Sequence, residues 1–170
     1  MAKILEEADL IAAGVPATFL RKKLSESGMS SIHTYVTSKA HLTQSRESAL
    51  SVYLKFPTEG LAAEGACLFT RALCLDGVSC GLVSSSALQT FATDYLKDCR
   101  EVTIYPEAKT LVVVGLSAVS ANRQLVEGLL LRRYFTGTSL VICSHLSPAD
   151  ELDDQVGRAL AVDLPRIELM

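Results

Sequence analysis

Residues 53–63 read YLKFPTEGLAA, and this stretch decides the fold. It has the pattern of a strand that runs into a glycine-marked turn and then into a helix. In many α/β proteins a phosphate-binding loop lies at this place. The stretch therefore raises the question of whether the chain holds a nucleotide.

A working phosphate-binding loop has the pattern GxxxxGK[ST]. Its glycines let backbone N–H groups approach the phosphates, its lysine neutralises them and its hydroxyl holds magnesium. Placed at the strand end, the pattern puts Phe56 at the first glycine, Ala62 at the lysine and Ala63 at the hydroxyl. Gly60 falls inside the loop, and Glu59 adds a negative charge beside the phosphate position. The loop is therefore interpreted as degenerate.

A shifted alignment of the same pattern covers residues 60–67, GLAAEGAC, and matches both glycines. It places Ala66 at the lysine and Cys67 at the metal ligand, and it separates the loop from its strand. Both alignments lack the lysine and the hydroxyl. The first alignment is preferred because it follows the strand directly.

Apolar runs alternate with amphipathic segments from about residue 48 onward. The third and fourth runs are nearly continuous Val, Leu and Ile, which is typical of strands buried on both faces. Strands that alternate with helices predict βαβ units, a mainly parallel sheet and right-handed crossovers that place helices on both faces. The predicted strands are 51–56, 79–85, 111–116, 139–144 and 166–170, and the predicted helices between them are 60–75, 86–98, 121–134 and 149–160.

The carboxyl ends of parallel strands are where such sheets bind ligands. Gly115 and Leu116 stand at the end of the third predicted strand, where metal-assisted phosphoryl transfer needs one or two acids. His145 follows the fourth strand, where a polar side chain commonly senses the γ-phosphate; a structural hydrogen bond is the alternative role. Cys143 lies two residues before His145, a spacing that strains a thiolate–imidazole pair.

The chain has 170 residues, of which 49% are hydrophobic, and this predicts one domain with a small N-terminal appendage. Residues 1–45 are predicted to form a helical segment and linker, and residues 46–170 the α/β core. Within the first part, short helices are expected at 5–14 and 16–28. The serine and threonine content of residues 25–45 favours a loop or linker there.

Charge and cysteine content exclude several classes of protein. The net charge of −3 and the pI of about 5.6 argue against coating nucleic acid by bulk charge. The five cysteines are scattered and form no CxxC pair, which favours reduced buried thiols and no metal site. Acids interrupt the N-terminal apolar stretch and no apolar run approaches about 18 residues, so we expect a cytoplasmic protein that neither carries a signal peptide nor spans a membrane.

Read together, these segments resemble the helicase-loader and transposition-helper branch of the AAA+ proteins, the DnaC/DnaI/IstB type. YLKFPTEGLAA followed by CLDGVSCGLVSSSAL resembles that family's strand, phosphate loop, helix and second strand. TLVVVGLSAV is similar to its Walker B segment, which usually ends in two acids. The segment from LLLRRYFTG to VGRAL resembles its asparagine-Arg-Tyr helix end, sensor strand and Gly-Arg, and AAGVPATFL resembles its Gly-Ile-Pro segment near the N-terminus.

The resemblance implies a P-loop NTPase-like AAA+ core, a three-layer sandwich around a five-stranded, mainly parallel sheet of order 5-1-4-3-2. The chain stops where a lid subdomain would start, so the lid is expected to be absent. The loop lysine, the metal hydroxyl, both acids and the sensor asparagine of the family are missing. The resemblance thus implies a non-catalytic pseudo-ATPase without cofactor or metal, rather than an enzyme.

Such a protein is expected to act as an adaptor or regulatory subunit in DNA replication, recombination or transposition. Its implied partner is a replicative helicase, an active AAA+ protein or a second copy of itself, with DNA as a further candidate. Arg158 resembles the family's arginine finger, and the alternative is a surface arginine favoured by a helix dipole. Arg132, Arg133 and Arg123 form a candidate patch for DNA phosphates, or else a solvated helix end.

Two other functions stay open at this point. One is a residual nucleotide-binding ATPase that uses an atypical phosphate loop. The other is a self-assembling structural or interaction protein built on the same sheet. Nucleotide binding would favour the first, and a discrete homo-oligomer without other ligands would favour the second.

Overall fold

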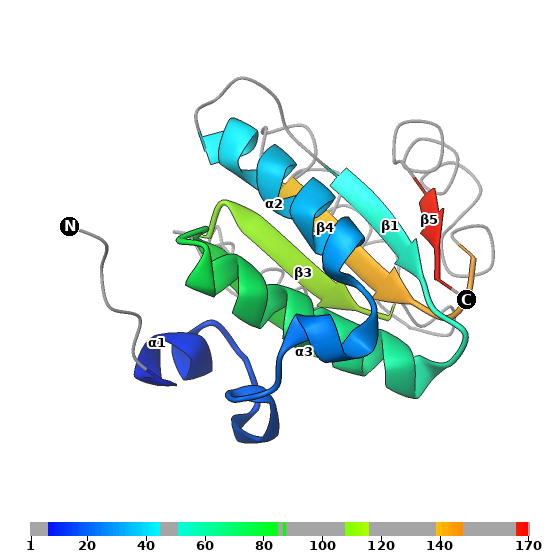
Figure 1. Ribbon diagram of the computed structural model, residues 1–170, viewed down its shortest axis with the longest axis horizontal. Coiled ribbons are helices and arrows are strands. Elements are labelled where there is room, and N and C mark those ends of the chain that lie inside the picture. The colour runs from blue at the N-terminus through cyan, green and yellow to red at the C-terminus, as the bar shows by residue number, and fades with distance from the viewer. Residues whose placement is uncertain are drawn as a thin grey trace, which may run out of the picture.

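A single five-stranded sheet organises the molecule (Figure 1). The computed structural model describes residues 7–44, 51–84, 87, 108–115, 139–147 and 166–169. The strand order is β2-β3-β4-β1-β5, and each neighbouring pair is parallel. This confirms the predicted order, read from the opposite edge. The strands are β1 Ser51–Lys55, β2 Cys80–Ser84, β3 Thr110–Val114, β4 Ser139–Ser144 and β5 Arg166–Glu168.

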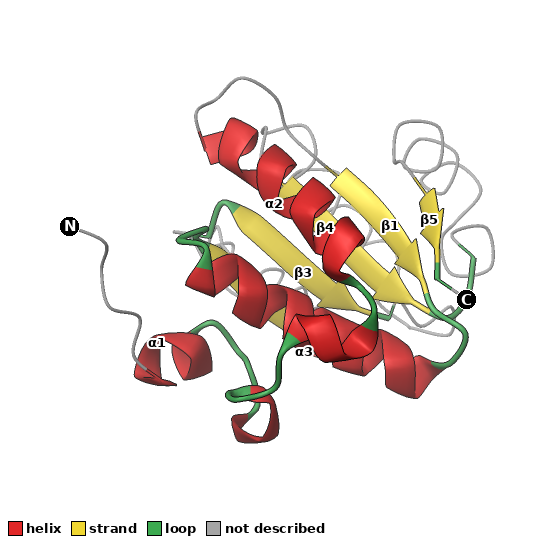
Figure 2. Ribbon diagram, in the orientation of Figure 1, coloured by secondary structure: helices red, strands yellow, loops and turns green. Residues whose placement is uncertain are grey.

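Two long helices cover one face of this sheet. Helix α3, Glu59–Leu75, packs across β2, β3 and β4, and α2, Ser30–Gln44, lies beside it on the same face (Figure 2). The predicted helix at 60–75 is thus confirmed within one residue. The predicted helices at 86–98, 121–134 and 149–160 lie outside the described residues, apart from residue 87. In the part of the chain that the structure describes, no helix is long and apolar enough to cross a membrane.

The central strands are buried on both faces. Val112 and Val141 belong to the core beneath α3, while Leu111 and Val113 point the other way and are equally buried. Every residue of β4 is buried as well. The prediction of strands buried on both faces is therefore confirmed, and this burial is what a three-layer sandwich requires.

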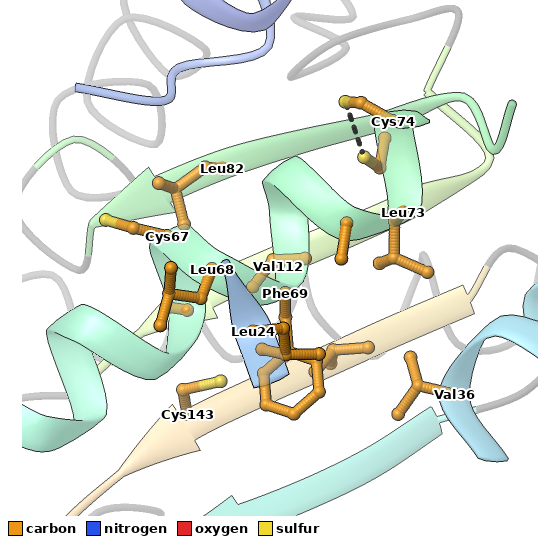
Figure 3. Packing of buried hydrophobic residues seen from close by; sticks show 14 of the residues in the cluster. Leu24, Val36, Cys67, Leu68, Phe69, Leu73, Cys74, Leu82, Val112 and Cys143 are labelled. Atoms are coloured by element: carbon orange, nitrogen blue, oxygen red, sulfur yellow. Dashed lines mark hydrogen bonds between the residues drawn. The ribbon is translucent and has the colours of Figure 1, made fainter. Parts of the chain in front are cut away.

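One apolar core joins the N-terminal segment to the sheet. Leu24 and Val36 from that segment pack in the same cluster as Phe69 and Leu73 of α3 (Figure 3). Backbone bonds tie the two parts as well, since the Leu82 N–H of the edge strand β2 donates to the Ala13 carbonyl at 2.7 Å. The division of the chain at residue 45 stays a prediction, but both sides contribute to one core.

The loop or linker predicted over residues 25–45 is wrong for residues 30–44, which form α2. Val36 and Ala40, one helical turn apart, are fully buried against the core. The hydroxyls that suggested a loop bond back to the helix instead: Thr34 Oγ1 donates to the Ser30 carbonyl at 3.0 Å, and Ser38 Oγ to the Thr34 carbonyl at 2.6 Å. Tertiary burial of a narrow apolar stripe thus overrides an unfavourable composition.

The remaining N-terminal elements are short. Helix α1, Glu7–Ala12, agrees with the first predicted helix, whereas the second predicted helix is two 3-10 turns, η1 Ala17–Phe19 and η2 Leu24–Ser27. Gly28, with φ of 71°, ends the second turn in the left-handed conformation. The Arg71 Nε of α3 donates to the Leu20 carbonyl at 2.6 Å, so this irregular segment is fastened to α3.

The buried hydroxyl of Thr110 generates a stability prediction. Among the described residues it has no hydrogen-bond partner, although Thr110 is fully buried at the start of β3. Thr110→Val should raise the free energy of unfolding by about 1 kcal/mol, because it removes a desolvated and unpaired hydroxyl. Urea unfolding measures this change.

Thr70→Val is the matched control for this substitution. Thr70 is equally buried, but its Oγ1 donates to the Ala66 carbonyl at 2.8 Å. The control should lower stability, or leave it unchanged, because a made hydrogen bond is lost. A loss of stability in Thr110→Val as large as that of the control would show that the Thr110 hydroxyl is bonded.

Candidate functional site

The carboxyl ends of β1, β3 and β4 lie side by side at one edge of the sheet. The Phe56 N–H donates to the Ser144 carbonyl at 2.7 Å, and the Gly115 N–H donates to the Cys143 carbonyl at 2.8 Å. Phe56, Gly115 and His145, each singled out in a different sequence segment, therefore come together at this edge. Leu116, Arg123, Arg132, Arg133 and Arg158 lie outside the described residues.

The connection from β1 to α3 is three residues long, Phe56–Thr58. Thr58 is the N-cap of α3: its Oγ1 accepts from the Leu61 N–H at 3.3 Å, and its carbonyl accepts from the Ala62 N–H at 3.0 Å. A phosphate loop needs such N–H groups turned toward the ligand. Here two of them are used inside the first turn of the helix.

The shifted alignment of the phosphate-loop pattern is wrong. Its whole length, residues 60–67, lies within the continuous helix α3. The N–H groups of a regular helix beyond its first turn bond to carbonyls one turn earlier, so they do not form a cradle for phosphate. The first alignment, which begins at Phe56, is the one that coincides with the strand–helix junction.

Phe56 fills the corner beneath this junction. Its side chain is 3% exposed, and a Cβ added at Gly65 would overlap its ring. The ring therefore lies directly against the backbone of α3, in contact that only glycine permits. Sequence reasoning treated Gly65 as a second glycine of a loop and missed this packing role. The sequence does contain a signal for this contact: a large aromatic residue, Phe56, at the strand end and a glycine, Gly65, inside the helix that follows.

The lysine position of the pattern faces the core. Ala62 is 1% exposed, Ala63 is half-buried and Gly60 is exposed at the start of α3. Glu59 is exposed in the first turn, where a carboxylate is favoured by the helix dipole. That carboxylate would repel a phosphate group placed at the same helix end.

The turn after β4 is held by its neighbours. Ser144 Oγ accepts from the Leu146 N–H at 3.2 Å, and the Tyr53 hydroxyl of β1 donates to the Leu146 carbonyl at 3.2 Å. His145 is half-buried in this turn. Its assignment to a γ-phosphate sensor position stays a prediction.

The cysteine near this edge is not set up as a nucleophile. Cys143 is fully buried in the core beneath α3, and burial raises the pKa of its thiol far above the usual range. Burial likewise raises the pKa of Cys67 to about 11. Both thiols are therefore protonated at neutral pH, which disfavours a thiolate–imidazole pair of Cys143 with His145.

The described residues do not fit a magnesium-bound nucleotide held by a phosphate loop. The junction is short and capped by Thr58, the Phe56 ring occupies the corner, and the lysine position is turned into the core. Within the described ranges, no group of three or more His, Cys, Asp or Glu side chains is placed to hold a metal ion.

Several solved structures share this fold. A candidate primosome component from Streptococcus pyogenes serotype M3 has a TM-score of 0.60 and 16% identity, over 98% of this chain and 97% of its own. DnaI has a TM-score of 0.59 and 16% identity, over 91% of both chains. Domain III of the Thermotoga maritima replication initiation protein DnaA has a TM-score of 0.56 and 12% identity. The sequence matches no protein-family model and no curated protein.

These similarities confirm the predicted fold class, an α/β core with a five-stranded parallel sheet, which this chain shares with DnaI and the primosome component. DnaI is also one of the proteins whose pattern the sequence resembles, and the match extends over nearly the whole of both chains. The similarity to DnaA is more partial, because this chain spans 62% of the Thermotoga structure and 44% of AMPPCP-bound DnaA from Aquifex aeolicus. Identities of 9–16% show a shared fold and leave activity to be argued from the site.

The contact between Phe56 and Gly65 yields a matched pair of substitutions. Gly65→Ala should lower the free energy of unfolding by roughly 1–3 kcal/mol, because the new Cβ overlaps the Phe56 ring. Gly60→Ala lies in the same helix with nothing within 4 Å of the new Cβ, and should be neutral or stabilising by up to about 1 kcal/mol. Urea unfolding compares the two variants.

A double variant separates packing from backbone effects. In Phe56→Leu/Gly65→Ala the smaller side chain makes room for the Cβ, so the double variant should be more stable than the sum of the two single losses predicts. Additive losses, or a Gly65→Ala variant as stable as Gly60→Ala, would show that the ring does not pack against Gly65.

Proposed function

We propose that this chain is a non-catalytic relative of the helicase loaders, which acts as an adaptor or regulatory subunit in DNA replication, recombination or transposition. The observation that carries the proposal is the filled strand–helix corner, where Phe56 packs against Gly65. The described sheet and α3 have the fold of these replication proteins, whereas the strand–helix junction carries a buried aromatic ring in place of the first loop glycine, which supports a loss of phosphate binding.

The charge balance at the corner supports the absence of ATP hydrolysis. A nucleotide triphosphate carries about three to four negative charges, and losing one charge contact in such a site costs on the order of 2–4 kcal/mol. Here Glu59 adds a like charge, and two of the described lysines pair with carboxylates: Lys22 Nζ lies 3.3 Å from Glu64 Oε1, and Lys55 Nζ lies 4.0 Å from Glu168 Oε1. Because the loop lysine is missing and Glu59 adds a negative charge, we expect no measurable binding of ATP.

A protein partner then carries the function. We propose a replicative helicase, an active AAA+ protein or a second copy of the chain as that partner, with DNA as a further contact, and the cytoplasm as the location. Following the family resemblance, Arg158 would reach a neighbouring subunit's nucleotide, and Arg123, Arg132 and Arg133 would contact phosphates or an acidic partner. These four roles rest on the sequence pattern.

Nucleotide titration tests the first half of the proposal. Titration of the purified chain with ATP or ADP and Mg²⁺, up to millimolar ligand, should give no saturable binding. Ala62→Lys, which restores the lysine of the pattern, should not create binding. It should also lower the free energy of unfolding by roughly 2 kcal/mol or more, because position 62 faces the core.

Ala63→Lys is the control for that substitution, since position 63 is half-buried and the longer side chain can reach water. It should be less destabilising than Ala62→Lys. Micromolar ATP binding by the unmodified chain, or its appearance in a well-folded Ala62→Lys variant, would contradict the proposal and favour a residual ATPase.

Affinity capture tests the second half. The tagged full chain, expressed in its own cells, should recover a replicative helicase or another AAA+ protein, and crosslinking should report any bound DNA. Arg158→Ala or Arg132→Ala/Arg133→Ala should reduce this recovery several-fold, whereas Lys23→Ala, at an exposed position of the N-terminal segment, should not. Recovery of no helicase, no other AAA+ protein and no DNA would contradict the adaptor role, and a discrete homo-oligomer in that case would favour a self-assembling protein.

A further inference from the structure

Two thiols meet at the end of α3 that is remote from the candidate site. Cys74 lies in the last turn of α3 and Cys80 is the first residue of β2, and their sulfur atoms are 3.2 Å apart (Figure 3). The candidate site lies at the carboxyl ends of the strands, whereas Cys80 begins its strand. This cysteine pair therefore belongs to the opposite edge of the sheet.

A tight turn holds the pair in register. Gly77, with φ of 79°, takes the left-handed conformation that ends α3, and its N–H donates to the Cys74 carbonyl at 3.0 Å. The Val78 N–H donates to the Leu73 carbonyl at 2.9 Å, which fastens the next residue as well. The two sulfurs thus face each other in the folded chain, and closing them to a disulfide of about 2.05 Å needs an approach of only about 1 Å.

The pair differs from the other described cysteines in sharing a proton between two thiols. Cys74 and Cys80 each keep 8% of their surface exposed, close to the 6% of Cys67, whereas Cys143 is fully buried. The hydrogen bond from the Cys80 thiol lowers the pKa of Cys74, against the opposing effects of burial and of the Asp9 carboxylate. The same hydrogen bond, together with burial, raises the pKa of Cys80. Cys74 is therefore the better thiolate of the two.

We propose that Cys74 and Cys80 form a redox modification site, at which a small-molecule disulfide such as oxidised glutathione converts the two thiols reversibly into an intramolecular disulfide. This inference is independent of the adaptor role, because it involves neither the strand ends nor a partner.

The step balances as two thiol–disulfide exchanges. The Cys74 thiolate attacks one sulfur of the small disulfide and releases the other as a thiolate, which takes up the proton that Cys74 has lost. The Cys80 thiol then loses its proton and attacks the Cys74 sulfur of the mixed disulfide, releasing the second small thiol, which carries that proton. The two protein sulfurs are oxidised by two electrons in total, and one molecule of small disulfide is reduced to two thiols.

Peptide mapping of the full chain tests this proposal. Trypsin cleaves after Arg71 and Lys97, so residues 72–97 form one peptide that holds Cys74 and Cys80 and no other cysteine. The folded chain is treated with oxidised glutathione, quenched in acid and alkylated in denaturant. The peptide should be two hydrogen masses lighter, unalkylated and free of glutathione. Dithiothreitol should restore two alkylatable thiols.

Variants identify the order of attack. Cys80→Ser should accumulate glutathione on Cys74, because the resolving thiol is gone, and Cys74→Ser should give a several-fold slower adduct on Cys80. Cys67→Ser, which changes a cysteine in the middle of α3, should leave the internal disulfide unchanged. The oxidised unmodified chain should also melt higher by roughly 5 °C, because a cross-link restricts the unfolded chain.

Three results would overturn the proposal. One is a 72–97 peptide that stays fully alkylatable after treatment of the folded chain. Another is an internal disulfide that forms only when the chain is first unfolded in guanidinium chloride. The third is a peptide that carries two separate glutathione adducts. The mapping of the unmodified chain decides among these outcomes even if a variant does not fold.

Discussion

Burial of α3 against β2, β3 and β4 is the constraint on which the rest of the structure depends. Ten of its seventeen residues are buried, and the N-terminal segment packs on the same helix through Leu24 and Val36. Small residues on its buried side, Ala62 and Ala66 among them, let the helix lie close to the sheet. This packing therefore fixes the positions of both ends of α3. The first end follows β1, and the second end precedes β2.

At the first end of α3, this packing explains why the junction with β1 differs from a phosphate-binding loop. The helix begins at Glu59, after a three-residue connection from β1, and the Phe56 ring lies beneath the helix against Gly65. A phosphate loop exposes backbone N–H groups toward its ligand in a widened turn. At this junction the Leu61 and Ala62 N–H groups instead donate to Thr58, and the Phe56 ring is buried beneath the helix. The apolar contacts that stabilise the fold thus determine the shape of this strand–helix junction.

At its second end, the same helix meets the edge strand. The left-handed Gly77 turns the chain from α3 into β2, and α2 is fastened nearby because His33 Nε2 lies 3.0 Å from Asp76 Oδ2. This turn also brings Cys74 and Cys80 together, because the backbone directs their two thiols toward each other. The length of α3, Glu59–Leu75, separates this edge of the sheet from the carboxyl edge.

The sequence by itself predicted the α/β class, the five strands and the helix after β1, because runs such as LVVV are apolar at every position and alternate with amphipathic segments. The strand order was implied by the family resemblance, and the structure confirms it. It also predicted a phosphate-binding loop without its lysine and hydroxyl, because Phe56, Ala62 and Ala63 differ in type from the residues that phosphate binding needs. Local residue types were sufficient for these predictions, the strand order excepted.

Only the tertiary structure decided the rest. Residues 30–44 form a helix because Val36 and Ala40 find a core, although their serine-rich and threonine-rich neighbours favour a loop. Gly65 is a packing residue because the Phe56 ring reaches it across the junction, and Cys74 meets Cys80 because one turn brings a helix end to a strand start. Each of these features depends on a contact between residues that folding brings together. A pattern of residue types along the chain does not specify which residues make such contacts.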